Sequence, residues 1–291
     1  MPARSINEGF RTFHSNITSS NYESGKAASH KVSITRRLEE YYDLNQLFYS
    51  GSANNGTSIS CHSDVDFFAS IPSSKLKNNS ATSLREIKQC LQKRFPNTKI
   101  HVDSPAVVLN FGSAEWDTAE VIPADYVEQK TGNRVYDIPD GAQGWMRSSP
   151  SIHNAYVRAE NNRLNKKLKP LIRFLKAWKY YCNVPISSFY LELRATKWME
   201  AEETIIYDMD LCTLFKKLDS CALADMQDPK GISGYIPACA TEAKKTDALS
   251  KLATAKTRAE KAREEEKEER TKNAFDWWDK LFAGNFPGYY K

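Results

Sequence analysis

The strand-forming segments of this 291-residue chain are confined to its first half, and this limits the fold more than any other feature. Three segments are rich in apolar, β-branched and aromatic residues, as strands are: SDVDFFASIP (63–72), HVDSPAVVLNF (101–111) and EWDTAEVIPADYV (115–127). Apolar residues at helical spacing predict helices over 5–48 and 73–96. The order helix, strand, helix, strand, strand predicts a mixed sheet with helices, so the fold class is α+β.

After residue 150 the sequence predicts helices only. Apolar residues at helical spacing predict the first over 161–182, and two more are predicted over 189–202 and 211–226. Residues 243–270, rich in Lys, Glu and Ala, predict a solvated helix of mixed charge. Pro170 interrupts the first of these patterns and marks either a kink or a helix start. We therefore expect two domains, 1–150 with the N-terminal helix and 151–291, and a ligand-binding cleft between them.

Composition narrows the class of protein only a little. The net charge of +5 suits a partner that carries phosphate, although many proteins without such partners are equally basic. No apolar run approaches the ~18 residues of a membrane span, and the N-terminus lacks an export signal. The six cysteines form no C-x-x-C pair, and the adjacent Cys61 and His62 have no second pair of zinc ligands after them. We expect a cytoplasmic protein with reduced thiols and no membrane partner.

Two aspartates, Asp64 and Asp66, lie two residues apart at the start of the first predicted strand. Alternate side chains of a strand share a face, so both carboxylates point to one side and Val65 points into the core. Like charges held together are costly to ionise, and Mg²⁺ removes that cost. Two such ions ~4 Å apart can promote an in-line phosphoryl displacement. The third carboxylate that this needs is predicted to be Glu120, with Asp117 as the reserve candidate.

A Gly-Ser pair, Gly51 and Ser52, precedes the aspartates by about a dozen residues. Gly51 has no Cβ, so a phosphate can approach its backbone. Ser52 offers a hydroxyl and an amide, and the next turn, if helical, presents free amides to an anion. Neither a lone D-x-D nor a lone Gly-Ser is specific, but their combination with an acid before VIPA predicts a metal–triphosphate site.

These motifs resemble those of the nucleotidyltransferase superfamily of DNA polymerase β type. The closer resemblance is to the cGAS/DncV-like nucleotidyltransferases of bacterial anti-phage signalling. It extends over nearly the whole chain and is carried by GSANNGTSI (51–59), SDVDFF (63–68), AEVIPAD (119–125), LIRFLKAW (171–178), SSFYLELR (187–194) and WWDKLFAGNFP (277–287). It implies a polymerase β-like lobe followed by a helical lobe that closes the nucleotide cleft.

The resemblance also implies roles in the first lobe. Asp64, Asp66 and Glu120 match the ligands of two Mg²⁺ ions, for which Mn²⁺ can substitute. The third ligand is usually aspartate in this family, so Glu120 is a departure from the pattern. Gly51 and Ser52 match the phosphate-binding turn.

In the second lobe the resemblance assigns two residues to the donor triphosphate, Lys176 and Ser188. Arg173, one turn before Lys176, could add a second positive charge. A solvated helix charge is the alternative for Lys176. Phe189 matches an aromatic residue that stacks on a base; a core position is equally compatible with its place at a helix start, and Tyr190 is then the fallback.

The function that the resemblance implies is template-independent joining of ribonucleoside triphosphates into a cyclic di- or trinucleotide with release of pyrophosphate. The hydroxyl of one nucleotide would attack the α-phosphorus of another. ATP is the expected substrate, with GTP, UTP or CTP possible, and a downstream effector in anti-phage defence (CBASS) would read the product.

Two other functions remain open from the sequence. The same chemistry could modify an RNA end or a protein side chain, although the balanced charge of 243–270 argues against a nucleic-acid partner. Because glutamate replaces the usual aspartate at position 120, the protein could also be a catalytically weak nucleotide-binding sensor.

Overall fold

A computed structural model describes residues 2–18, 21–61, 64–112, 117–130 and 132–291. His62 and the first two residues of the third predicted strand, 115–116, lie outside the described residues. Contacts between Cα atoms divide the chain into two units. The sheet unit comprises 19–156 and 230–234, and the helical unit comprises 1–18, 157–229 and 235–291.

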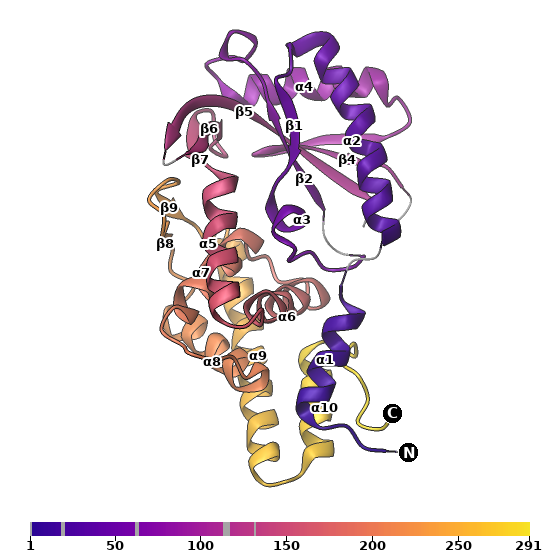
Figure 1. The fold of residues 1–291 in the computed structure, drawn as a ribbon, viewed down its shortest axis with the longest axis vertical. Helices are drawn as coiled ribbons and strands as arrows, with labels where there is room; N and C mark the ends of the chain where they lie inside the picture. The colour runs from indigo at the N-terminus through magenta and orange to yellow at the C-terminus, as the bar shows by residue number, and fades with distance from the viewer. Residues whose placement is uncertain (1, 19–20, 62–63, 113–116, 131) are drawn as a thin grey trace. The chain divides into compact units, whose positions relative to one another are not determined.

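The sheet unit is built on one mixed sheet, seven-stranded over the residues described (Figure 1). Its strands are β1 (Gln46–Tyr49), β2 (Val65–Ser70), β3 (Lys99–Asp103), β4 (Ala106–Asn110), β5 (Thr118–Lys130), β6 (Asn133–Pro139) and β7 (Trp145–Ser148). They pair in the order β1-β2-β5-β4-β3, and β6 joins β5 to β7. β2 and β5 run parallel, whereas the other pairs are antiparallel. β2 and β5, the strands that carry the predicted acids, are therefore neighbours.

Two helices, α2 (Asn21–Tyr42) and α4 (Ser80–Arg94), cover one face of this sheet (Figure 1). Ile34 and Leu38 of α2 lie one turn apart, and α4 presents its own apolar stripe. They pack on the odd-numbered residues of β2 and β5, including Phe67 and Val121. Val65 packs against the same core. The even-numbered residues, Asp66 and Glu120 among them, therefore belong to the other face.

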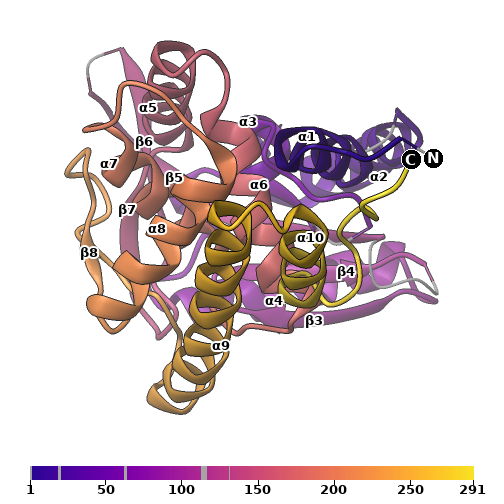
Figure 2. The same cartoon turned by 90° about the horizontal axis from the view of Figure 1, so that it is seen from below.

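The helical unit contains α1 (Ile6–Asn16), the second half of α5 (Pro150–Arg163), α6 (Leu168–Tyr181), α7 (Ser188–Met199), α8 (Tyr207–Ser220), α9 (Glu242–Lys267) and α10 (Thr271–Leu281). A short strand pair, β8 (Met226–Gln227) and β9 (Tyr235–Ile236), completes it. Helices α9 and α10 lie side by side (Figure 2). Phe10 and Phe13 of α1 pack on aromatic rings from α6 and the C-terminal segment.

The predicted α+β class, with a mixed sheet and a following set of helices, is confirmed, but several elements differ from the prediction. The predicted helix 5–48 is two helices, and its end is the edge strand β1, because Gln46–Tyr49 pairs with β2. The predicted strand 101–111 is a hairpin of β3 and β4 that turns at Ser104–Pro105. β6 and β7 were not predicted.

The grouping of contacts places residues 2–18 in the helical unit, whereas the sequence suggested that the N-terminal helix belongs to the first lobe. The physical reason is the aromatic face of α1: Phe10 lies with its ring centroid 5.1 Å from those of Phe174, Trp278 and Phe286. Pro170 lies in the first turn of α6, so it marks a helix start and not a kink. No helix in the described part of the chain is long and apolar enough to cross a membrane.

Candidate active site

The parallel pairing of β2 and β5 places Asp66 directly opposite Glu120. Asp64 immediately precedes β2 and, two residues before Asp66, belongs to the same face. All three carboxylates are half-buried. The sheet therefore brings together the three acids that the sequence selected.

Glu120 has a strongly perturbed pKa. Five causes together raise the pKa of Glu120 to about 9; burial is the largest, and the negative charges of Asp66 and Asp64 come next. A hydrogen bond between the carboxyls of Glu120 and Asp66 and the charge of Asp103 are the other two. Without a cation the site therefore favours a protonated Glu120. Asp103, at the end of β3, is an additional acid that sequence reasoning missed, because the β3–β4 turn was not recognised.

Gly51 is required at this site by the position of Asp66. Its φ of +51° is in the left-handed region that glycine tolerates best, and it starts α3 (Gly51–Asn55), the five-residue helix after β1. A Cβ on Gly51 would lie 1.9 Å from Asp66 Oδ2. The amide of Ser50 donates to the carbonyl of Asp66 over 2.9 Å, which holds the two segments together. Gly51 thus gives room to a carboxylate, a contact that the sequence did not predict.

The argument that a divalent metal ion fits this site is based on the negative charge of the carboxylates and not on a complete set of metal ligands. Across the described residues, no group of three or more His, Cys, Asp or Glu side chains is arranged to hold a metal ion. The charges of Asp66 and Asp64 nevertheless raise the pKa of Glu120, as expected of carboxylates near enough to repel one another. Oxygen ligands of this kind match Mg²⁺ or Mn²⁺, whose charge would remove the repulsion.

Asp117, the reserve candidate, has different partners. Its carboxylate lies 3.1 Å from Lys26 Nζ and 2.9 Å from His30 Nε2. Burial opposes its ionisation, but the hydrogen bonds with His30 and Lys26 outweigh burial and lower the pKa of Asp117. The structure therefore brings Glu120, and not Asp117, beside Asp66.

In the helical unit, Lys176 is a buried residue. Its side chain is 2% exposed, and its Nζ lies 2.7 Å from Glu192 Oε2 on α7. A lysine that binds a triphosphate must reach the ligand, so this pair would have to open for the predicted role. The alternative of a solvated helix charge is wrong, because the Lys176 side chain is buried.

Lys179, which the sequence analysis passed over, lies beside the predicted Ser188. Lys179 Nζ donates to Ser188 Oγ over 2.7 Å, and Tyr180 Oη is 3.4 Å from the same oxygen. Lys179 is half-buried, unlike Lys176. One signal could have identified Lys179 from the sequence: it lies three residues after Lys176, on the turn of α6 that faces the start of α7.

Phe189 and Tyr190 lie in opposite environments at the start of α7. The side chain of Phe189 is 40% exposed, so the core alternative is wrong for it. Tyr190 is buried, and its hydroxyl donates to the carbonyl of Ala224 over 2.8 Å. Of the two rings, that of Phe189 is thus the more accessible to solvent. Arg173, the predicted second positive charge, has a partner on α1: its Nη1 lies 2.7 Å from His14 Nε2.

The sheet with paired acids and a Gly-Ser helix start defines the polymerase β-like class of nucleotidyltransferases. Residues 5–161 match the Second Messenger Oligonucleotide or Dinucleotide Synthetase domain. The chain belongs to this family, which confirms the expected resemblance to the cGAS/DncV-like nucleotidyltransferases and, at the level of the family, the enzyme class.

Known proteins resemble the chain over most of its length. A probable cyclic nucleotide synthase of Bacillus cereus is 24% identical over 218 residues, which are 72% of this chain and 64% of that protein. The chain thus spans less than two thirds of the length of this relative.

Solved structures share the fold. CdnC of Escherichia coli MS115-1, solved with ATP, superposes with a TM-score of 0.72 at 16% identity, covering 97% of this chain and 98% of that one. DncV of Vibrio cholerae, solved with the linear intermediate 5′-pppA(3′,5′)pG, gives a TM-score of 0.64 at 15% identity, with coverage of 84% and 70%.

Proposed function

We propose that this protein joins ribonucleoside triphosphates into a cyclic di- or trinucleotide second messenger and releases pyrophosphate. The observation that carries the proposal is the direct pairing of Asp66 with Glu120 on adjacent parallel strands, with Asp64 two residues before Asp66. Family membership and the linear dinucleotide bound to the related DncV support the same reaction.

Asp64, Asp66 and Glu120 are the residues that would hold Mg²⁺, and Mn²⁺ would be expected to substitute. A divalent cation supplies neutralisation of phosphate charge and a lower pKa for a bound hydroxyl. Without a cation the raised pKa keeps Glu120 protonated at neutral pH, and a cation that neutralises Asp64 and Asp66 would favour its ionised form. We propose that Glu120 accepts the proton of the attacking ribose hydroxyl once Asp64 and Asp66 are neutralised.

We propose that Ser52 and the Lys179–Ser188 pair bind phosphate groups, and that Phe189 stacks on a nucleobase. Gly51 acts by admitting the Asp66 carboxylate. Arg173 keeps its sequence-based assignment to the triphosphate as a prediction. Lys176, whose Nζ is paired with Glu192, is the alternative to Lys179 at the triphosphate, and variants can separate the two. A role in anti-phage defence, an effector that reads the product and a cytoplasmic location also stay predictions.

Mass spectrometry of the products formed from all four ribonucleotides and Mg²⁺ tests the proposal. We expect pyrophosphate and a product that resists phosphatase because it has no free phosphate end. Asp66→Asn should lower turnover by at least ~10²-fold, since it removes one charge from the metal site. Asp103→Asn, which changes an acid beside the same group, is the matched control and should retain most activity.

Two results would contradict this reaction. Label transfer from ATP only when RNA or protein is added would indicate the nucleotidyltransferase with another acceptor. Binding of Mg²⁺-ATP without any pyrophosphate release would indicate the sensor.

A further inference from the structure

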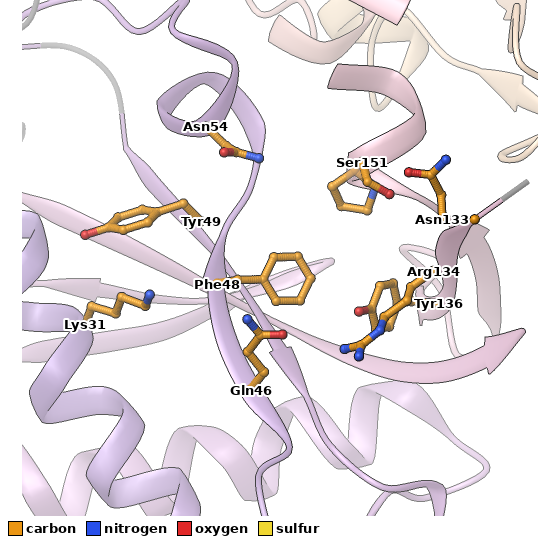
Figure 3. Close-up of a pocket in the computed structure, with 11 residues that line it drawn as sticks. Lys31, Gln46, Phe48, Tyr49, Asn54, Asn133, Arg134, Tyr136 and Ser151 are labelled. Carbon is orange, nitrogen blue, oxygen red and sulfur yellow. The ribbon is translucent and has the colours of Figure 1, made fainter. Parts of the chain in front are cut away.

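A cavity of about 490 Å³ lies in the sheet unit beside the edge strand β1, and no role assigned above uses it (Figure 3). It is lined by residues of α2, β1, α3 and β6 and by the start of α5. The volume lies within the range of small-molecule sites, roughly 300–1,000 Å³.

Aromatic rings form much of the wall. Phe48 points toward Tyr136 and Arg134, while Tyr49 points to the other side of β1, toward Lys31 (Figure 3). Phe48 and Tyr136 have ring centroids 5.7 Å apart at an interplanar angle of 41°. Because Phe48 is only half-buried, part of its ring is accessible from the cavity. A planar aromatic ligand can stack there.

Charge in the cavity is of one sign. Lys31 and Arg134 both line it, and none of its described lining residues is Asp or Glu. Lys31 Nζ lies 4.9 Å from the centroid of the Tyr49 ring. The backbone next to the arginine is held in place, since Ser149 Oγ donates to the carbonyl of Arg134 over 2.7 Å. Arg134 lies on the side of β1 to which Phe48 points, and Lys31 lies on the other side (Figure 3), so the planar guanidinium of Arg134 is the group that can bind a phosphate beside the Phe48 ring.

Hydrogen-bonding groups complete the lining. Gln46, Asn54 and Asn133 contribute side-chain amides. β1 is an edge strand of the described sheet, so one side of its backbone presents alternating N–H and C=O groups. A nucleobase carries donors and acceptors on its edges, which a simple aromatic acid does not.

We propose that this cavity is a second nucleotide site, with the base against Phe48 and the phosphate at Arg134, while Lys31 adds positive charge from the other side of β1. Asn54 of its lining belongs to α3, the helix whose first residue contacts Asp66. A ligand at one end of α3 therefore has a direct connection to the catalytic carboxylates at the other. The site binds its ligand without metal or turnover, so the proposal does not depend on the proposed reaction.

Isothermal titration in EDTA with four nucleoside 5′-monophosphates tests the site, because the unneutralised carboxylates disfavour phosphate at the catalytic centre. Adenosine, which lacks the phosphate of AMP, and ribose 5-phosphate, which lacks its base, serve as probes of the ring and of the charge. We expect one monophosphate to bind one-to-one and at least ~10-fold more tightly than either its nucleoside or ribose 5-phosphate. No binding of any monophosphate at millimolar concentration, or equal binding of ribose 5-phosphate, would overturn the proposal.

Matched variants locate the binding. Lys31→Gln/Arg134→Gln removes two positive charges from the cavity and should weaken binding at least ~10-fold. Arg36→Gln/Lys130→Gln removes two charges from α2 and β5 outside the lining and should change it less than ~2-fold. Phe48→Leu should weaken the monophosphate but not ribose 5-phosphate. Asp66→Asn should leave binding intact; equal loss in both double variants, or loss in Asp66→Asn, would refute a separate site.

Discussion

At the scale of single residues, the raised pKa of Glu120 predicts how stability depends on pH. The ordinary value is 4.5, and the folded value is about 9. Between these pH values the folded chain keeps a proton that the unfolded chain releases, so the free energy of unfolding falls as pH rises. The stabilising contribution of the proton is complete below about pH 4.5 and is lost by about pH 9.

Glu120→Gln should remove this pH dependence. In EDTA at about pH 8 we expect the variant to unfold with a free energy higher than wild type by on the order of a few kcal/mol. Near pH 4.5 the two proteins should differ little. Urea denaturation at both pH values measures the effect, and Glu128→Gln, an exposed position of the same strand, is the control. Parallel pH profiles of wild type and Glu120→Gln would contradict the buried position of this carboxyl.

A second prediction concerns Lys176 and Lys179. We expect a substitution of Lys176 to affect mainly stability and a substitution of Lys179 to affect mainly substrate binding. Lys176→Met leaves the Glu192 carboxylate buried without its cation and should cost about 3–5 kcal/mol of folding free energy. Lys179→Met breaks a partly exposed contact and should change stability by less than ~1 kcal/mol, but raise the KM for ATP at least ~10-fold. Thermal unfolding and steady-state kinetics measure the two effects.

The double variant Lys176→Met/Glu192→Met is the control for this pair, since an apolar replacement of a buried ion pair is often tolerated. We expect it to fold and to retain a near-normal KM. The opposite result would be a stable double variant with a raised KM for ATP, together with a Lys179→Met variant whose KM is unchanged. It would assign triphosphate binding to Lys176.

At the scale of elements, helix α1 is held by its aromatic face. Phe10 is fully buried and has ring contacts with α6 and α10. Phe10→Ala should lower the free energy of unfolding by about 3–5 kcal/mol, because the cavity cannot close fully. Arg11→Ala, on the exposed side of the helix, should change it by less than ~0.5 kcal/mol. Guanidinium denaturation that finds the two variants equal would show that α1 does not dock on the helical unit.

Sequence patterns were sufficient to predict some helices and strands but not others. α4 was predicted from Leu84, Ile87 and Leu91, and these residues do form its buried side. β1 and β6 were missed, because Gln46–Tyr49 is too short to show alternation and β6 is recognisable mainly by its partners β5 and β7. The cap of α4 is Asn79, whose side-chain oxygen accepts a hydrogen bond from the amide of Thr82.

At the scale of the whole molecule, ligand binding should be visible as added stability. Mg²⁺ with α,β-methylene ATP, which resists attack at the α-phosphorus, should stabilise the fold by about 2.7 kcal/mol at one hundred times its Kd. We expect a rise of several degrees in Tm, lost in EDTA and reduced in Asp64→Ala/Asp66→Ala. Differential scanning fluorimetry measures it, and an equal shift with and without Mg²⁺ would contradict a metal-dependent nucleotide site.

The sequence by itself determined the identity of the acids. A strand repeats its faces every two residues, so Asp64 and Asp66 had to share one, and the apolar run around Glu120 required a neighbouring strand. Only the tertiary structure decided which side chains meet across elements. The register of β2 and β5 decides that Asp66 lies opposite Glu120, and the packing of α7 against α6 decides that Lys176 pairs with Glu192. The path of the chain after β1 decides how much space lies beside Gly51. These contacts join residues distant in sequence, and local periodicity carries no information about such pairs.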